Sequence, residues 1–382
     1  MRITIVAESY PSKGDPSFPF VQQLAYALSN EGNEVFIIAP QSITKALIRR
    51  LPIKPLLSED ISPECNTVHI VRPTYLTFSN TRNILLCRFS DRLMKNAIKK
   101  AIKIIGNIDV LYCYFWHIGL ITSCVSGDIP LFVQASECEI TVRPYMVTEK
   151  ALKKIKGVVC ASGKNLNESI EAGLTNESNC QVIVNGYRPD QFYPMDRLNL
   201  RRALGFPEDK FIIAFVGGFI ERKGVRELSE AINRFDDVYS IFIGRGDCVP
   251  SCKNILFQGS VEHEDIVKYL NCADIFVLPT KAEGCCNAII EALACGLPVV
   301  SSNKSFNDEI LDDSCSIRVD ETDSNQISEA ISLLKNDVAL RENMSLNAIS
   351  KSNQLRVDLR GQKVASFIDK QVKIGDKENH YL

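Results

Sequence analysis

Two glutamates in the last third of the chain, Glu283 and Glu291, stand where a parallel sheet would bind a ligand. The apolar run at 275–279 predicts a buried strand before them, and 297–300 predicts the next strand after them. Glu283 precedes Gly284 in the intervening loop, whereas Glu291 falls inside the helix that follows. In an open parallel sheet, ligands bind where the carboxyl ends of strands meet the amino ends of helices. The two carboxylates are therefore candidates for contacts to the hydroxyl groups of a ligand.

The start of the same helix offers donors for a phosphate. The backbone N–H groups from Gly284 through Cys285 and Cys286 to Asn287 have no partner within the helix, and they favour an anion. Asn287 lies four residues before Glu291, so the two share one helix face. Hydroxyl and phosphate groups occur together in a sugar nucleotide, which is the ligand class that this pattern predicts. The competing interpretation is that the strand–loop–helix unit serves only as scaffold.

A second candidate phosphate site follows the apolar run at 211–216. That run ends in Gly217 and Gly218, and the basic pair Arg222 and Lys223 comes shortly after. Glycine lets a backbone approach a ligand closely, and fixed cations stabilise the charge that builds on a departing diphosphate. No Asp-x-Asp cluster stands in a convincing loop, so we predict chemistry without a metal. The alternative is a plain glycine turn followed by a solvated helix start.

The elements that position these residues alternate between short apolar runs and helical segments, which is typical of doubly wound parallel sheets. The turn-rich connector 185–194 separates two such series, and a chain of 382 residues is long enough for two cores. We expect two α/β domains, residues 1–190 and 191–354, and a final helix over about 355–373. The expected strands are 3–7, 35–39, 110–114, 131–134, 158–161 and 182–184, and then 211–216, 239–243, 255–258, 275–278, 299–301 and 316–319.

The block from Ala273 to Val300 resembles the donor-site signature of family 4 glycosyltransferases, and the chain is similar to members that build bacterial surface polysaccharides. The resemblance implies the GT-B architecture of two facing Rossmann-like domains, with the C-terminal helix crossing back onto the first domain. It further implies a retaining hexosyltransferase that uses a nucleotide-sugar as co-substrate, UDP-linked in our prediction, and no other cofactor. By resemblance, Glu283 meets the donor sugar and Glu291 meets the ribose.

The glycine turns of the second domain also resemble family positions. Gly217 and Lys223 keep their places in the family's Gly-Arg…Lys-Gly motif, but Gly218 stands where the arginine would be. We expect Arg222 to supply the missing cation from a shifted position. Taken alone, each further glycine turn is better explained as a tight turn. The remaining nucleotide-side positions by resemblance are Gly244, Gly259, Ser260 and Val261.

The first domain departs further from the family. Loop 8–20 lacks the glycine pair that many members place against the donor phosphate. Gln134 stands where the family's active-site histidine would be, and Glu137 stands where its aspartate would be; both are candidates for hydrogen bonds to the sugar or the acceptor. His117 follows the expected strand 110–114 and is a further substrate-binding candidate. A lone histidine at such a place is more often a helix cap or a packed side chain.

Basic residues gather between Lys45 and Lys103, where twelve Lys and Arg stand against four Asp and Glu. Residues 81–95 mix basic and apolar side chains, as amphipathic helices on anionic leaflets do, although an ordinary solvated helix face is the alternative. Together with the family's lipid-linked acceptors, this favours a glycan or polyprenyl-linked acceptor and peripheral contact with the inner membrane surface. A net charge of −2 gives no reason to expect nucleic acid. With no signal peptide or membrane-length apolar run, we expect a cytoplasmic protein.

Two other functions fit the same architecture. A sugar-nucleotide 2-epimerase would need acid–base residues in the first domain, and the sequence shows no such set. A sugar-nucleotide-binding protein without turnover is compatible with Gln134 and Gly218 at positions where the family has catalytic contacts.

Overall fold

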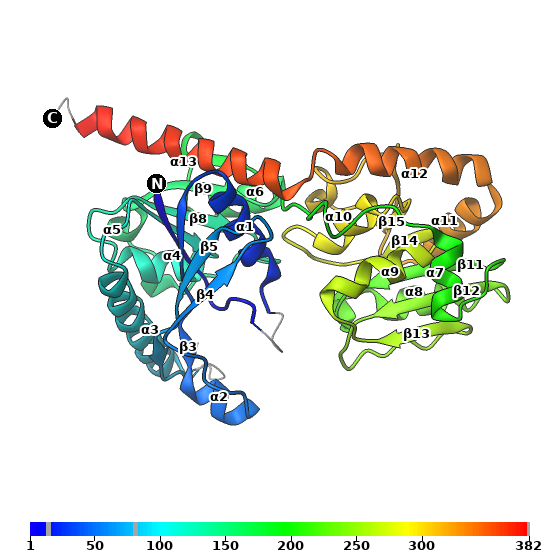
Figure 1. The fold of residues 1–382 in the computed structure, drawn as a ribbon, viewed down its shortest axis with the longest axis horizontal. Coiled ribbons are helices and arrows are strands. Elements are labelled where there is room, and N and C mark those ends of the chain that lie inside the picture. The colour runs from blue at the N-terminus through cyan, green and yellow to red at the C-terminus, as the bar shows by residue number, and fades with distance from the viewer. Residues whose placement is uncertain (13–16, 79–82, 380–382) are drawn as a thin grey trace. The chain divides into compact units, whose positions relative to one another are not determined.

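The computed structural model describes residues 1–12, 17–78 and 83–379, which form two compact units (Figure 1). Unit 1 comprises Met1–Ile183 together with the chain from Arg360 onward, and unit 2 comprises Val184–Leu359. The chain therefore passes between the units after residues 183 and 359, where we expected limits at 190 and 354. Each unit holds a mainly parallel sheet with helices packed on it, which confirms the α/β fold class.

Unit 1 is built on an eight-stranded sheet that is parallel except for one antiparallel pair at its edge. The expected strands are present, but two more follow them at that edge. The outermost strand alternates half-buried and exposed residues, so it lacks the continuous apolar run that marks a buried strand. Across the sheet the strands are β10 (Cys180–Val182), β9 (Ile155–Cys160), β8 (Leu131–Ala135), β7 (Val110–Tyr114), β1 (Arg2–Val6), β2 (Glu34–Ile38), β5 (Thr67–Val71) and β4 (Leu57–Ile61).

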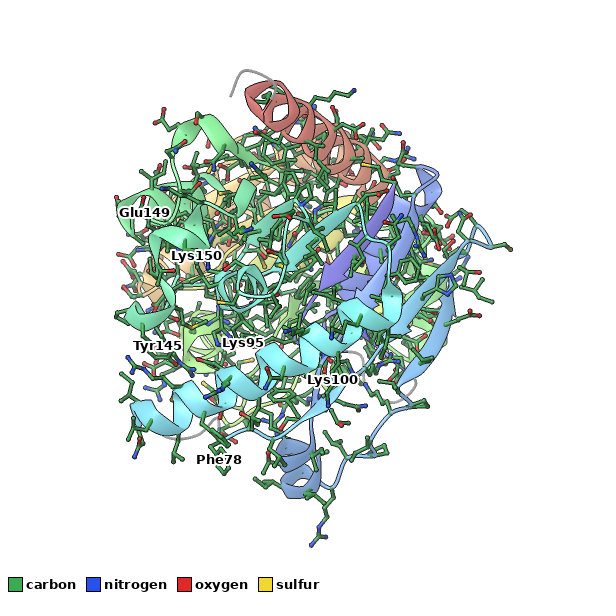
Figure 2. The ribbon with its side chains drawn as sticks, turned by 90° about the vertical axis from the view of Figure 1, so that its left-hand side faces the viewer. Phe78, Lys95, Lys100, Tyr145, Glu149 and Lys150 are labelled. Atoms are coloured by element: carbon green, nitrogen blue, oxygen red, sulfur yellow. The ribbon has the colours of Figure 1, made fainter. Side chains whose placement is uncertain are left out.

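The C-terminal helix α13 (Val357–Asn379) packs on unit 1 from Arg360 onward, as the family resemblance implies. A Cβ at Gly361 would lie 2.7 Å from Ala27 Cβ, so only glycine allows this close approach to α1 (Pro19–Asn30). The other elements of unit 1 are α2 (Ile43–Arg49), α3 (Ile84–Ile105), α4 (Trp116–Ser123), α5 (Glu149–Leu152) and α6 (Gly163–Glu171), and the strand pair β3 (Gln41–Ser42) and β6 (Thr74–Tyr75). Figure 2 shows α3 crossing one face of this unit.

Unit 2 contains a six-stranded sheet that is parallel throughout. Each strand expected from the sequence is present, with bounds that agree to within one residue. In order the strands are β13 (Ile255–Gly259), β12 (Val238–Ile243), β11 (Phe211–Val216), β14 (Ile275–Leu278), β15 (Val299–Ser302) and β16 (Ser316–Val319). The helices are α7 (Arg197–Leu204), α8 (Val225–Ile232), α9 (Ile266–Cys272), α10 (Asn287–Ala294), α11 (Ser324–Asn336) and α12 (Val338–Ser352).

Among the parallel strands of each sheet the chain order reverses at one place, between β1 and β7 in unit 1 and between β11 and β14 in unit 2. At such a switch point, the loops that follow the two strands turn to opposite faces and leave a crevice at the carboxyl edge, where ligands bind. Glu8 and His117 lie just after β1 and β7, and Gly217 and Glu283 lie just after β11 and β14. The topology thus brings the sequence-predicted residues of each unit to one edge.

None of the helices within the described ranges combines the length and the apolar character that a bilayer-spanning segment requires.

Candidate functional site

Glu283 lies at the crevice of unit 2 with two cations against its carboxylate. It is 7% exposed, and Lys223 Nζ forms an ion pair with its Oε1 atom. Arg222 Nη1 lies 3.2 Å from the same oxygen, and Thr280 Oγ1 donates a hydrogen bond of 2.8 Å to it. The structure therefore brings together the three residues that the sequence singled out for the sugar and the diphosphate.

The meeting of these residues follows from the pairing of β11 with β14. The N–H of Lys281 donates to the carbonyl of Arg222 at 2.8 Å and so joins the loops that follow the two strands. Gly224 has a φ of +70°, and a Cβ there would overlap the carbonyl oxygen of Pro279. Only glycine meets both conditions. Lys223 and Glu283 are 60 residues apart in sequence, but the interlocked loops hold them side by side.

Both cations of this cluster are held in place before any substrate arrives. Burial by itself lowers the pKa of Lys223, but the carboxylate of Glu283 beside it raises it, and the net shift is upward. Lys223 therefore stays charged at neutral pH. Arg222 also donates to the carbonyl of Ala282, which fixes its guanidinium. A diphosphate at this edge would meet preorganised positive charge.

Glu291 is held by His263, which belongs to none of the motifs seen in the sequence. Glu291 is 6% exposed in α10, and His263 Nε2 lies 3.1 Å from its Oε1 atom. Gln191 Nε2 lies 3.0 Å from His263 Nδ1 and donates to the carbonyl of His263 at 3.0 Å. Burial lowers the pKa of His263, but the hydrogen bond to Glu291 and the charge of that carboxylate together outweigh it, and the net shift is upward. Nothing in the local sequence signals this pair, which joins residues 28 apart.

The first residue of α10 lies about one helical turn before Glu291. Asn287 is its first residue, and its Oδ1 accepts a hydrogen bond of 2.8 Å from Asn185 Nδ2. Cys286 occupies the N-cap position, and no side chain caps the helix there. Gly284 and Cys286 are buried, whereas Cys285 and Asn287 are half-buried. Burial raises the pKa of the Cys286 thiol to about 12, so this residue packs as a neutral side chain.

Three glycine turns lie at the ends of the adjacent strands β11, β12 and β13. Gly217 N donates to Ile243 O at 2.9 Å, and Gly244 N donates to Gly259 O at 2.8 Å. A Cβ at Gly244 would overlap the carbonyl oxygen of Gly217, so the packing of one turn on the next requires glycine there. The other predicted positions flank this row. Gly218 is open, because the nearest atom beyond its chain neighbours lies 3.9 Å from a Cβ built on it. Ser260 is exposed and Val261 is half-buried.

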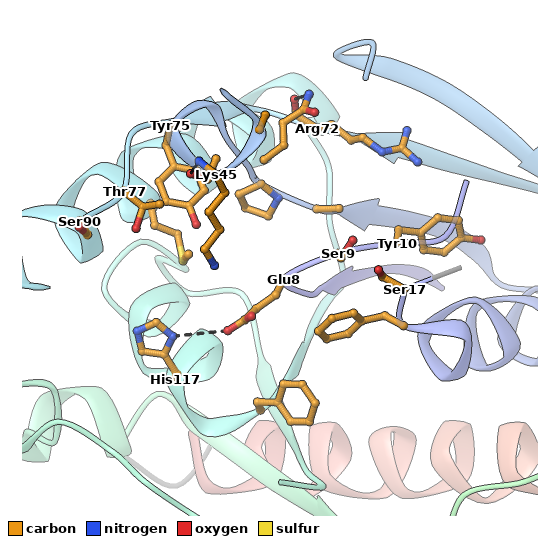
Figure 3. Close-up of a pocket in the computed structure, with 18 of the residues that line it drawn as sticks. Glu8, Ser9, Tyr10, Ser17, Lys45, Arg72, Tyr75, Thr77, Ser90 and His117 are labelled. Atoms are coloured by element: carbon orange, nitrogen blue, oxygen red, sulfur yellow. Dashed lines mark hydrogen bonds and ion pairs between the residues drawn. The ribbon is translucent and has the colours of Figure 1, made fainter. Parts of the chain in front are cut away.

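A cavity of about 920 Å³ lies at the crevice of unit 1 (Figure 3). Its lining combines carboxylates with basic side chains from α2 and the loops around it. Figure 3 shows Lys45 and His117 directed toward Glu8 within this cavity. Of the loop 8–20, residues 13–16 lie outside the described ranges. The charged residues of the lining are Glu8, Lys45, Arg49, Lys54, Arg72, Asp91, His117, Glu137 and Arg143.

His117 is the centre of an ion-pair network in this cavity. Its Nε2 atom lies 3.1 Å from Asp91 Oδ1, and its Nδ1 atom lies 3.9 Å from Glu8 Oε1. Arg143 Nη1 and Tyr145 OH each donate to Asp91 Oδ2 at 2.6 Å. Burial lowers the pKa of His117, but the hydrogen bonds to Asp91 and Glu8 raise it to about 9. His117 is therefore a charged cavity residue, and not the helix cap or packed side chain that is usual for a lone histidine.

Gln134 and Glu137 lie in different surroundings. Gln134 is fully buried and outside the cavity lining, and its Oε1 accepts hydrogen bonds from Tyr112 OH at 2.5 Å and Arg360 Nη2 at 3.2 Å. Its side chain thus ties α13 to the sheet. Glu137 lines the cavity and accepts the N–H of Trp116 at 2.6 Å, at the start of α4. Burial raises the pKa of Glu137 to about 7, against the opposing effect of that backbone donor.

Within residues 1–12, 17–78 and 83–379, no group of three or more His, Cys, Asp or Glu side chains is arranged to hold a metal ion.

The sequence and the fold match known proteins. Residues 196–351 match the family described as glycosyl transferases group 1. The chain is 27% identical over 321 residues to the putative teichuronic acid biosynthesis glycosyltransferase TuaC of Bacillus subtilis, which covers 79% of this chain and 81% of TuaC. It is 23% identical over 374 residues to the N,N'-diacetylbacillosaminyl-diphospho-undecaprenol alpha-1,3-N-acetylgalactosaminyltransferase of Campylobacter jejuni, covering 94% of this chain and 97% of that enzyme. Among solved structures, Anabaena HepE in complex with UDP aligns with a TM-score of 0.71 at 16% identity, covering 97% of this chain and 100% of HepE.

Two α/β units with parallel sheets, together with the match to HepE, show the GT-B fold, and the relatives that the chain resembles are named glycosyltransferases. Residues 196–351 form a domain of the glycosyl transferases group 1 family, the kind of enzyme that the block from Ala273 to Val300 indicates.

Proposed function

We propose that this enzyme moves a sugar from a UDP-linked donor to a glycan or lipid-linked glycan in polysaccharide biosynthesis, with retention of configuration and without a metal. The observation that carries the proposal is the cluster of Glu283 with Lys223 and Arg222 at the unit 2 crevice. A buried carboxylate suits the hydroxyls of the donor sugar, and the adjacent cations suit its diphosphate. Glu291, on the helix that starts at the same edge, suits the ribose hydroxyls.

This cluster is suited to the departure of a nucleoside diphosphate. In the transfer, the bond from the anomeric carbon to the diphosphate oxygen breaks, and its electron pair stays on the diphosphate. The acceptor hydroxyl oxygen bonds to that carbon, and its proton passes to the departing diphosphate. Lys223 and Arg222 would stabilise the charge that builds on the leaving oxygen, which is why we propose that a metal is not required. Retention of configuration is proposed from the family resemblance.

The relatives support the proposed donor and acceptor. HepE has been solved with UDP, and the Campylobacter enzyme is named for a diphospho-undecaprenol acceptor. TuaC is named for teichuronic acid biosynthesis, and CapM of Staphylococcus aureus, a further relative, is named for capsular polysaccharide biosynthesis. We propose that this enzyme likewise extends a glycan, polyprenyl-linked or free, in the cytoplasm at the inner surface of the membrane.

The test is incubation of the purified chain with a panel of UDP- and GDP-sugars, with nucleotide release as the readout. The proposed transferase should release UDP slowly from one donor, release it faster when an acceptor glycan is added, and keep this activity in EDTA. Formation of a second sugar nucleotide would instead identify a 2-epimerase. Binding of a donor without turnover, even with acceptor glycans present, would identify a binding protein.

A further inference from the structure

Large apolar side chains are exposed mainly on one part of unit 1. Among the described residues, thirteen of the twenty-three such side chains lie between residues 47 and 89. The most exposed are Ile48 at 80%, Leu47 at 72% and Leu85 at 69%. A single exposed leucine is normal, but apolar side chains that gather on one surface mark a site of interaction.

Hydrogen bonds join the segments that carry these side chains. Thr44, in the first turn of α2, donates through Oγ1 to the carbonyl of Thr77 and accepts the Thr77 N–H, each at 2.8 Å. The N–H of the next residue, Phe78, donates to Ser90 Oγ of α3 at 2.8 Å. Both views place α2 and the first turns of α3 at the same end of unit 1 (Figures 1 and 2). We call this end the docking surface; its apolar residues are Leu47, Ile48, Leu51, Ile53, Phe78, Ile84, Leu85 and Phe89.

The backbone of the docking surface is fixed, so its apolar side chains remain outward. After α2, the N–H of Leu51 donates to the carbonyl of Ala46 at 2.9 Å. Gln41 then pins the following loop, because its Oε1 accepts the N–H of Lys54 at 3.0 Å and its Nε2 donates to the Lys54 carbonyl at 2.7 Å. Phe78 and Phe89 pack with ring centroids 6.1 Å apart and still remain 40% and 49% exposed.

Positive charge accompanies the apolar side chains. Lys45, Arg49 and Arg50 in and after α2 are exposed, as are Arg88 and Arg92 on α3. No Asp or Glu occurs within residues 43–58 or 83–90. A surface that is cationic and apolar together fits an anionic lipid leaflet, because the apolar side chains enter the acyl region while Lys and Arg meet the headgroups.

The docking surface borders the unit 1 cavity. Lys45, Arg49 and Leu51 line that cavity from the side of α2, and Cys87 and Ser90 line it from α3. Leu47 and Ile48, by contrast, point to the surface and do not line it. A leaflet against the docking surface would therefore lie at the edge of the cavity, where the head of a lipid-linked acceptor can enter.

We propose that this surface docks unit 1 on an anionic lipid leaflet and so presents the cavity to a lipid-linked acceptor. The docking itself stands on the exposed residues and their charge, whereas the presentation of an acceptor rests on the proposed function. The sequence predicted a membrane-binding helix at 81–95, of which 81 and 82 lie outside the described ranges. In the structure, α2 and the loop after it carry the two most exposed apolar side chains. We therefore place the main membrane contact there.

The test is flotation of the full chain with phosphatidylcholine vesicles, with and without phosphatidylglycerol. The chain should float with the anionic vesicles and be released by salt, which screens charge. The double variant Leu47→Glu/Ile48→Glu should weaken vesicle binding by about tenfold or more, since carboxylates are repelled by anionic lipid. The matched control is Leu346→Glu on α12 of unit 2, which is 68% exposed and should float like the unaltered chain.

Nucleotide release without acceptor gives an independent readout of the fold and the donor site. It should be unchanged in the double variant, because residues 47 and 48 do not line the cavity. If the double variant does not fold, Leu85→Glu, at the start of α3, takes its place. Equal flotation of these variants and the unaltered chain overturns the proposal. The proposal is also overturned if the unaltered chain does not bind vesicles but forms a dimer, and the double variant is a monomer. If no sugar nucleotide of the panel released its nucleotide, the proposed function would be overturned, but the flotation result would still test the docking.

Discussion

The crevices of the two units lie at switch points of the same kind, but the group at the centre of each has the opposite charge. In unit 2, the carboxylate of Glu283 is held by Lys223 from the loop after the neighbouring strand. In unit 1, the cation of His117 is held by Glu8 and Asp91. Two of these contacts, Lys223 with Glu283 and Glu8 with His117, span a switch point, between β11 and β14 and between β1 and β7. Parallel-sheet topology alone therefore explains why residues so far apart in sequence meet.

The two crevices differ in which of the paired side chains keeps its charge and which one titrates. Unit 2 places one carboxylate among lysine and arginine side chains that stay charged at neutral pH, which suits a ligand that carries or develops negative charge. Unit 1 surrounds a titratable histidine with carboxylates, which suits the hydroxyl groups of a neutral glycan. The loss of one partner should therefore affect chemistry in unit 2 and pH dependence in unit 1.

The largest effect is expected for Glu283→Gln. The amide keeps the size of the side chain but removes the charge that gathers Lys223 and Arg222, so we expect kcat for sugar transfer to fall about 10³-fold. The measurement is nucleotide release in the presence of acceptor. Glu230→Gln is the control, since Glu230 is exposed on α8 and should behave like the unaltered enzyme. A kcat of the Glu283 variant within about threefold of the control would remove this residue from the site.

A smaller effect is expected for His263→Ala, because His263 is a positioning residue that acts through Glu291. Loss of a hydrogen bond to a charged group costs ~2 kcal/mol, so the Kd for UDP should rise about 30-fold while kcat changes little. His263→Gln should restore part of the affinity, since its amide nitrogen can reach the same carboxylate oxygen.

The ribose assignment sharpens this second prediction. If Glu291 meets the ribose hydroxyls, the unaltered chain should bind UDP more tightly than its 2′,3′-dideoxy analogue, and His263→Ala should reduce that preference. Calorimetric titration with both nucleotides measures it. A preference that His263→Ala leaves unchanged would show that the histidine holds Glu291 for structure alone.

The two regions also differ in how much their sequence reveals. The residues grouped around Glu283 come from two runs, 217–224 and 283–291, each of which follows an apolar strand. Strand order, glycines and charge together indicated that these runs meet, and their roles in catalysis stay predictions. His263 escaped notice because its contact with Glu291 depends on the packing of a separate segment.

The unit 1 cavity could not be predicted in the same way. Glu8, Asp91, His117 and Arg143 come from four separate segments, and no local spacing links them. Gln134 shows the opposite case. By the family resemblance it stands where a histidine is expected, but its side chain packs against α13 and does not line the cavity. The edge strand β4 was missed for a related reason, since a half-exposed strand lacks an apolar run.

The smallest effect should appear in the pH dependence of unit 1. The pKa of His117 is raised to about 9, above the ordinary value of about 6.5 that it regains on unfolding. The folded state thus holds the proton more tightly, so the stabilisation is fully present below about pH 6.5 and is lost as the pH rises through about 9. The shift corresponds to at most ~3 kcal/mol, and partial exposure of the network reduces it to about 1 kcal/mol.

A neutral replacement isolates this contribution. His117→Gln keeps a hydrogen-bonding side chain, so its deficit in unfolding free energy should be largest near pH 6 and nearly vanish near pH 10. Trp116 is the single tryptophan of the chain and lies in unit 1, so its fluorescence in a urea titration follows this unit alone. His69→Gln, at a histidine on β5 outside the cavity, serves as the control. Because other groups titrate alike in both chains, a deficit that stays constant from pH 6 to 10 would mean that His117 contributes packing and not charge.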